Sequence, residues 1–325
     1  MSINNRLINT GGAGGGAATR AYGVGSRKLT VYDISDPSNM SSLGQFTIPN
    51  TGAVYSVAID KENQLAYYTQ DQYVYKIDVS DPSNMSIVAQ ANGIYFDQSY
   101  EIAFNASNQT AYVTGRAYNL MKTVNVSNMG HQDRFGFSSP NGVVVYPEQG
   151  YGYTANGNDR TIKVINQSTT NCSIVSSLYD ADWRNIWKLD IDKETNTLFT
   201  LNQFYSSITA VDISNPLSLS KISVVGGSGT FSRGIAVDST NKVVYTASQN
   251  GLRSFDVSNT SSMSLLSTNQ LNASPTMYSV RVDPITQVAY IVGNAQLYSV
   301  DVSNPSSMPT IQAIGTSSDE YIAIA

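Results

Sequence analysis

The chain is built from one repeat, and this repeat restricts the possible folds more than any other feature of the sequence. Its most regular part is an apolar run that closes in Asp-x-Ser and often continues into a proline-containing turn. The first residue of this closing segment recurs at intervals of 41 to 47 residues, at Asp33, Asp78, Asn125, Asn166, Asp212, Asp256 and Asp301. A repeat of this length is typical of the four-stranded blades of a β-propeller.

Two further patterns precede the Asp-x-Ser segment. One is an alternating run, as in residues 55–60 (Tyr-Ser-Val-Ala-Ile-Asp), and the other is a small residue followed by an aromatic one, as in Ala66-Tyr67. Period-2 alternation, β-branched and aromatic residues and polar turns predict strands, and no useful length of the chain has helical periodicity. We therefore predict an all-β fold, a seven-bladed β-propeller of four-stranded blades.

The two ends of the chain complete each other. Residues 320–325 (Glu-Tyr-Ile-Ala-Ile-Ala) form an alternating run with nothing after it, whereas residues 21–35 contain the second and third patterns without the first. We predict that the C-terminal strand is the innermost strand of the blade that begins at residue 20. The propeller would then span residues 20–325 and be closed by its own last strand, which hides most sheet edges.

Two copies of the repeat resemble a known family. Residues 29–40 (Leu-Thr-Val-Tyr-Asp-Ile-Ser-Asp-Pro-Ser-Asn-Met) and 74–85 (Val-Tyr-Lys-Ile-Asp-Val-Ser-Asp-Pro-Ser-Asn-Met) are similar to the LVIVD repeat, although Met stands where that family usually has Pro. The resemblance implies propeller blades, and it implies repeat modules of surface or assembly proteins. Its motif contains no catalytic residue to carry over, so it predicts a fold and not a reaction.

Composition excludes several classes of function. Charged residues make up 13% of the chain and the formal net charge is -5, with no basic patch, so we predict no nucleic-acid partner. The single cysteine, Cys172, cannot form an intrachain disulfide, and the single histidine, His131, lies in a predicted strand-connecting loop and rules out a His-rich metal site. We find no signal peptide and no apolar run that would cross a membrane, and the cellular location stays open.

The recurring aspartates have two interpretations. A ring of acidic residues could bind metal, but Asp and Asn before Pro-Ser-Asn also cap turns with their side chains, and strict repetition favours the structural role. The same holds for Asp60, Asn105, Asp192, Asp238 and Asp283 at the ends of the alternating runs. We therefore predict no metal, no cofactor and no catalytic residue.

Variable side chains gather on one predicted face of the ring. The connections between blades, and those between the second and third strands, carry aromatic and arginine side chains, as expected of a binding face on a rigid frame. The predicted face comprises Tyr55, Tyr100, Asn141, Trp187, Arg233, Tyr278, Glu320, Trp183, Arg116 and Tyr118. Packing between blades is the alternative role for several of these aromatics. Asp190 and Arg281 replace a small residue of the alternating run and would line the channel or pair with neighbours.

Residues 1–19 lie outside the repeats and form a glycine-rich arm. We expect this arm to bind a protein partner and to anchor the propeller in a larger assembly, such as a virion or a surface structure. The leading hypothesis is a non-catalytic assembly or decoration module. The alternative is a carbohydrate- or receptor-binding propeller. An enzyme that acts on glycans is a third hypothesis, for which Glu320 and Asp190 are the candidate carboxylates.

Overall fold

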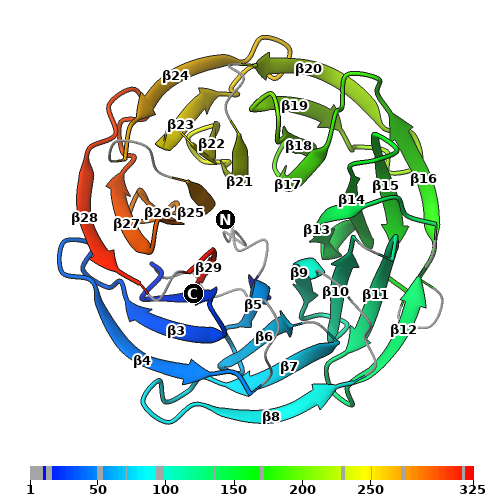
Figure 1. Cartoon of the computed structure of the whole chain (residues 1–325). Coiled ribbons are helices and arrows are strands. Elements are labelled where there is room, and N and C mark those ends of the chain that lie inside the picture. Colours follow the sequence, from blue (N-terminus) through cyan, green and yellow to red (C-terminus); the bar gives the residue numbers. More distant parts are fainter. Residues whose placement is uncertain are drawn as a thin grey trace.

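The computed structural model describes residues 10–11, 17–49, 54–70, 72–92, 99–116, 118–134, 136–168, 172–227, 231–249, 251–271, 276–316 and 319–325. For Thr10, Gly11, Val54, Tyr55, Ser99, Tyr100 and Asp133 only the backbone is described. Within these residues the chain forms seven blades of four antiparallel strands each, arranged as a ring (Figure 1), and the sheet of one blade has a fifth, parallel strand. This architecture confirms the predicted seven-bladed propeller.

Each blade runs from an innermost to an outermost strand. Blade I consists of β29 (Tyr321–Ile324), β2 (Arg20–Gly25), β3 (Lys28–Asp33) and β4 (Ser41–Thr47), and blade II of β5 (Val54–Asp60), β6 (Leu65–Gln70), β7 (Tyr73–Asp78) and β8 (Ser86–Ala91). Blade III consists of β9 (Ser99–Asn105), β10 (Thr110–Gly115), β11 (Leu120–Asn125) and β12 (Gly130–Arg134), and blade IV of β13 (Pro140–Tyr146), β14 (Tyr151–Asn156), β15 (Thr161–Asn166) and β16 (Ile174–Tyr179), with a 3-10 turn, η1 (Pro147–Gln149), after β13.

The remaining blades follow the same order. Blade V consists of β17 (Ile186–Asp192), β18 (Thr197–Asn202), β19 (Ser207–Asp212) and β20 (Ser220–Gly226). Blade VI consists of β21 (Ser232–Asp238), β22 (Val243–Ser248), β23 (Gly251–Asp256) and β24 (Ser264–Asn269), and blade VII of β25 (Met277–Asp283), β26 (Val288–Gly293), β27 (Gln296–Asp301) and β28 (Thr310–Gly315).

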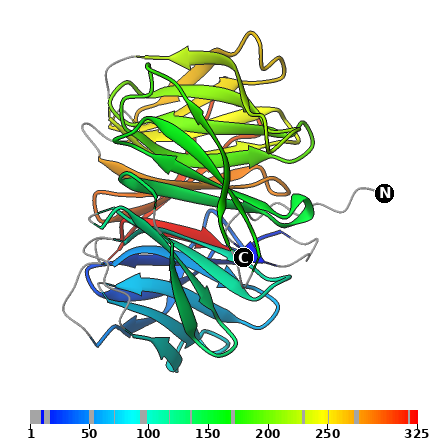
Figure 2. The same cartoon turned by 90° about the vertical axis from the view of Figure 1, so that its right-hand side faces the viewer.

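The C-terminal strand closes the ring. β29 pairs antiparallel with β2, with Tyr321 opposite Val24 and Ile324 opposite Ala21. Beyond β29, the carbonyl of Ala325 accepts the backbone N–H groups of Thr19 and Arg20. Figure 1 shows β29 in red at the inner edge of the blue blade I, and Figure 2 shows the same strand from the side. The predicted closure is confirmed.

The Asp-x-Ser segments form side-chain-capped turns, as predicted. In blade I, the Asp33 carboxylate accepts the backbone N–H of Ser35 at 2.9 Å and its hydroxyl at 2.6 Å. Asp36 binds the backbone and hydroxyl of Ser38 in the same way, at 2.9 and 2.7 Å. These bonds satisfy backbone groups that the strands cannot pair. The methionine that ends the turn, Met40, is buried between blades.

The same turns also connect neighbouring blades. A serine hydroxyl of one blade donates to a carbonyl in the turn of the next blade, over 2.5 to 2.7 Å. The pairs are Ser176 with Pro216, Ser223 with Thr260, Ser254 with Pro305 and Ser299 with Pro37. The repeated turn is therefore both the end of a strand and part of the contact between blades.

The described part of the N-terminal arm contacts the propeller itself. β1 (Thr10–Gly11) pairs parallel with β5, with Thr10 opposite Ile59 and Gly11 opposite Asp60. The backbone N–H of Ala18 donates to the Asp283 carboxylate at 2.9 Å in a buried position. Residues 1–9 and 12–16, to which the predicted anchor extends, lie outside the described residues.

The single histidine and the single cysteine lie away from the centre of the ring. His131 was predicted in a connecting loop, but it lies in β12, where it pairs with Val124, and its side chain is exposed. The predicted loop is wrong because the polar segment 130–134 forms the outermost strand of its blade, whose solvent-facing side needs no apolar residues. Cys172 is buried, and burial raises the pKa of its thiol.

Candidate functional site at the centre of the ring

The innermost strands surround a cavity at the centre of the ring. We call the face on which these strands begin the upper face, and the face on which they end the lower face. The upper face carries the connections between blades and those between second and third strands, because neighbouring strands are antiparallel. The cavity is open to solvent, and together with its opening it encloses about 810 Å³. Side chains that line it include Ser56, Glu101, Lys188, Asp190, Arg233, Ser279, Arg281 and Tyr321.

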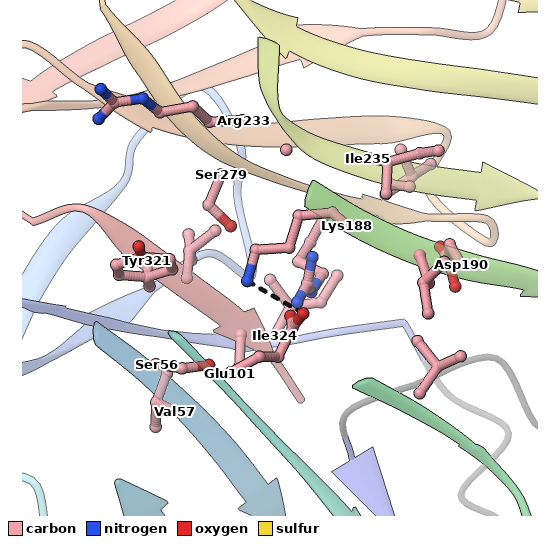
Figure 3. Close-up of a pocket in the computed structure, with 18 of the residues that line it drawn as sticks. Ser56, Val57, Glu101, Lys188, Asp190, Arg233, Ile235, Ser279, Tyr321 and Ile324 are labelled. Atoms are coloured by element: carbon pink, nitrogen blue, oxygen red, sulfur yellow. Dashed lines mark ion pairs between the residues drawn. The ribbon is translucent and has the colours of Figure 1, made fainter. Parts of the chain in front are cut away.

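A buried ion pair crosses the cavity. The Lys188 ammonium of blade V lies 3.0 Å from Glu101 Oε2 of blade III, and each side chain is 7% exposed (Figure 3). Burial lowers the pKa of Lys188, and the Glu101 carboxylate opposes this effect. The ammonium also lies 5.3 Å from the Tyr321 ring of blade I. Three blades thus meet through one lysine.

Gly142 of blade IV makes room for this ion pair. Blade IV lies between blades III and V, and Gly142 occupies the position that corresponds to Glu101 and Lys188. A Cβ atom at Gly142 would lie 3.2 Å from Glu101 Oε2 and 2.9 Å from the Trp187 carbonyl oxygen. The absent side chain allows residues of two non-adjacent blades to touch.

A second charged group of the cavity is formed by Asp190 and Arg281. Asp190 accepts the backbone N–H of Ile191 at 2.9 Å and, across the blade boundary, that of Val237 at 2.8 Å. Burial raises the pKa of Asp190 to about 7, while the positive charge of Arg281 acts in the opposite direction. Arg281 lines the same cavity, and its guanidinium donates to the Val280 carbonyl at 2.8 Å. Both variable residues singled out in the sequence therefore lie at the cavity.

The residues predicted at the start of each innermost strand share an unusual backbone geometry. In the described part of the chain, six innermost strands carry a register shift at this position. The residues skipped in the register are Tyr55, Tyr100, Asn141, Trp187, Arg233 and Tyr278. Such β-bulges redirect a side chain and interrupt pairing, and they are frequent beside functional sites. The seventh blade has Glu320 before β29, where its backbone N–H donates to the Val24 carbonyl.

The structure brings some of these side chains together. The Arg233 guanidinium lies 4.9 Å from the centre of the Tyr278 ring. Burial of Glu320 raises the pKa of its carboxyl, and the positive charge of Arg233 partly offsets this effect. Arg116 lies 5.8 Å from the Trp187 ring. The side chains of Tyr55 and Tyr100 are outside the described part of the structure.

Three residues of the predicted face lie in the interior instead, and one of them, Trp187, is 7% exposed with Arg116 over its ring. Trp183 is 1% exposed, packs in the core between blades IV and V, and donates its indole N–H to Thr209 at 3.1 Å. Asn141 is fully buried, and its amide donates to the Ile186 carbonyl at 2.8 Å. For Trp183 and Asn141 the structure favours the alternative of packing between blades. Tyr118, by contrast, is 54% exposed on the upper face.

Sequence reasoning missed Glu101 and Lys188. Both occupy the second position of the alternating run, where the other blades have Ser56, Gly142, Gly234, Ser279 and Tyr321. The available signal was a charged residue where most other blades have a small one. The same signal identified Asp190 and Arg281. Within the described residues, no cluster of His, Cys, Asp and Glu side chains has the arrangement of a metal site. No helix among them is long and apolar enough to cross a membrane.

Comparison with known proteins identifies the repeat. The LVIVD repeat matches residues 21–47, 63–92, 240–269 and 288–315. The chain is a β-propeller with LVIVD repeats. Each matched LVIVD segment covers the second, third and fourth strands of one blade, in blades I, II, VI and VII. No curated protein matches the chain in sequence.

Solved structures share the fold of this chain. A protein of Desulfotomaculum acetoxidans described as functionally unknown has a TM-score of 0.80 at 14% identity, over 95% of this chain and 99% of that one. A Lactobacillus plantarum protein has a TM-score of 0.80 at 10% identity, with 95% and 99% covered. The periplasmic gluconolactonase of Pseudomonas aeruginosa has a TM-score of 0.78 at 8% identity, with 94% and 98% covered. At these identities the likeness extends to the fold alone.

Proposed function

We propose that the protein is a non-catalytic propeller that binds a carbohydrate in the central cavity. The observation that carries the proposal is the alternation of cationic and carboxylate groups around one cavity, namely Glu101 with Lys188 and Asp190 with Arg281. A sugar hydroxyl both donates and accepts hydrogen bonds. Fixed donors and acceptors placed near one another therefore suit the neighbouring hydroxyl groups of a sugar. A ligand that is only a small ion would need a single opposite charge instead.

The carboxylates of the cavity are already engaged in holding the site together. Asp190 accepts backbone N–H groups from two blades, and Glu101 is paired with Lys188. Groups fixed in this way are suited to recognition, because they lose little freedom when a ligand binds. A gluconolactonase among the fold neighbours makes a sugar lactone the natural substrate with which to test for turnover.

The test is binding to a glycan array, followed by calorimetric titration of the glycans that bind. We expect Arg233→Gln to weaken binding by a factor of about 10 to 150, since a charge-assisted hydrogen bond contributes about 1.5–3 kcal/mol. Arg233 is half-buried and lines the cavity. Lys61→Gln, a loss of charge after β5 on the lower face, is the matched control. Equal affinity of both variants, or no bound glycan, would reject the proposal.

Catalysis is tested on the same protein. The wild type is incubated with glucono-δ-lactone and with each glycan that binds, and products are measured over time. We expect no turnover above the uncatalysed rate. Turnover that is lost in Asp190→Asn would show an enzyme and reject the non-catalytic part of the proposal.

We further propose that the arm, residues 1–19, attaches the propeller to a protein of a larger assembly such as a virion. In support, Thr10 and Gly11 of the arm lie at the lower end of β5, on the face opposite to the variable loops. Cross-linking of material from the natural source, read by mass spectrometry, should link the arm to another protein. Cross-links within the chain alone would contradict this role.

A further inference from the structure

Three large aromatic side chains lie exposed together on the upper face of blades V and VI. Phe204, Tyr205 and Phe231 are 46%, 40% and 38% exposed. The rings of Phe204 and Phe231 are 5.2 Å apart and nearly perpendicular, at 72°. Single exposed apolar residues are common, but grouped aromatics of this size usually mark a contact surface. We call these three residues the aromatic ledge.

The ledge is fixed in place beside the cavity. Phe204 and Tyr205 belong to the connection between β18 and β19, and Phe231 precedes β21. The backbone N–H of Ser232 donates to the Gln203 carbonyl at 3.2 Å, and the Ser232 hydroxyl donates to that of Ser206 at 2.8 Å. These bonds hold the two segments together. Ser232 lies directly between Phe231 and the cavity residue Arg233.

The chemistry of the ledge differs from that of the cavity. The cavity offers charged donors and acceptors, whereas the ledge offers ring faces and edges. A pyranose has a C–H face that packs on an aromatic ring and a hydroxyl edge that stays in water, so a half-exposed ring suits it. An apolar peptide would instead favour a deeper pocket that excludes water.

We infer that the aromatic ledge is a second sugar subsite, so that the ligand is an oligosaccharide with one residue in the cavity and the next on Phe204 and Phe231. This inference rests on the proposed carbohydrate binding. The cavity and the ledge are adjacent, because an oligosaccharide that leaves the cavity past Arg233 meets Phe231, two residues away along the backbone.

Titration with sugars of increasing length tests the inference. The probes are cello-, malto-, xylo-, chito- and galacturonate oligosaccharides, from the monosaccharide to the hexasaccharide. In the series that binds, we expect affinity to rise about tenfold from the monosaccharide to the disaccharide or trisaccharide. The double variant Phe204→Ala, Phe231→Ala should lose this gain and keep the affinity for the monosaccharide.

The control is Leu265→Ala, in the outer strand of blade VI, because the Leu265 side chain is as exposed as that of Phe204, at 46%. Affinity that does not depend on length, or a length gain that survives in the double variant, would overturn the subsite while leaving carbohydrate binding intact. Failure of all five series to bind the wild type would overturn both proposals. Circular dichroism confirms that each variant is folded.

Discussion

Gly142 shows how a residue without a side chain shapes the centre of the ring. The Glu101–Lys188 pair spans the blade to which Gly142 belongs, and the space above this glycine is filled by the carboxylate. Breaking a buried ion pair costs more than the pair contributes, because the remaining charge stays desolvated. The identity of this one position therefore decides whether blades III and V can be connected.

We predict that Gly142→Ala destabilises the protein by about 1–3 kcal/mol, the usual cost of overpacking. Its Cβ would lie 2.9 Å from the Trp187 carbonyl oxygen, which belongs to the backbone and cannot swing away. The measurement is denaturant-induced unfolding. Gly315→Ala is the matched control, because a Cβ there meets no atom within 4 Å. Equal stability of the two variants would contradict the prediction.

Asp190 should make stability depend on pH. Burial raises the pKa of its carboxyl from 3.8 to about 7, so its contribution to stability is fully present below the ordinary pKa and is lost as the pH rises through about 7. Between about pH 5 and about pH 8 the melting temperature of the wild type should fall, and Asp190→Asn should reduce this fall. Glu320, whose pKa burial also raises, titrates in both proteins. If the melting temperature falls by the same amount in the wild type and in Asp190→Asn, the assignment to Asp190 is refuted.

At the scale of elements, the turn after each third strand does more than reverse the chain. In blade I, side-chain bonds of Asp36 fix the turn, and the Pro37 carbonyl accepts the Ser299 hydroxyl of blade VII. Blades I and II meet differently: a Cβ at Gly44 would lie 1.8 Å from the Pro82 carbonyl oxygen, so the backbones pack directly. The repeated sequence thus encodes the contact between blades as well as the blade.

Removing one such bond should weaken one blade boundary. Ser299→Ala deletes the 2.7 Å bond to the Pro37 carbonyl, between blades VII and I, and the 3.1 Å bond that the same hydroxyl accepts from the backbone N–H of Gln312. We expect a loss of about 1–3 kcal/mol in the free energy of unfolding, the usual net value of two hydrogen bonds. Ser306→Ala, at an exposed position in the turn of blade VII, serves as the control. The two variants are compared by thermal unfolding, and indistinguishable midpoints would speak against the role of Ser299.

At the scale of the whole molecule, four residues of β29 decide whether the ring is closed. This strand supplies the inner edge of blade I, and its Ile322 and Ile324 are buried against blades I and VII. Opening the ring would expose an unpaired strand and two blade surfaces, which are sites of aggregation. Closure is therefore a property of the complete ring and not of one blade.

We predict that deleting Tyr321 to Ala325 destabilises the entire propeller instead of fraying one end. The expected result is insoluble protein, or a thermal transition that is lower and less cooperative. Tyr321→Phe, which keeps β29 in place, should remain soluble and fold. A truncated protein with the solubility and melting temperature of the wild type would show that closure contributes little.

The sequence by itself determined the repeat, the blade number and the closure. Apolar alternation fixes which residues face a neighbouring sheet, and Asp-x-Ser turns fix where strands end, so both are readable from residues close together in the chain. The divided repeat at the two termini then required β29 to join β2. Asp190 and Arg281 were identified as channel candidates because repeats can be compared with one another.

Only the tertiary structure decided how the centre of the ring is occupied. The Glu101–Lys188 pair depends on a gap at Gly142, which no local pattern encodes. Trp183 and Trp187 are both large and close in sequence, yet one packs in the core with Thr209 and the other faces Arg116. The physical reason is that side chains from different blades meet according to the curvature of the ring and the β-bulges of its inner strands, and both arise from long-range packing.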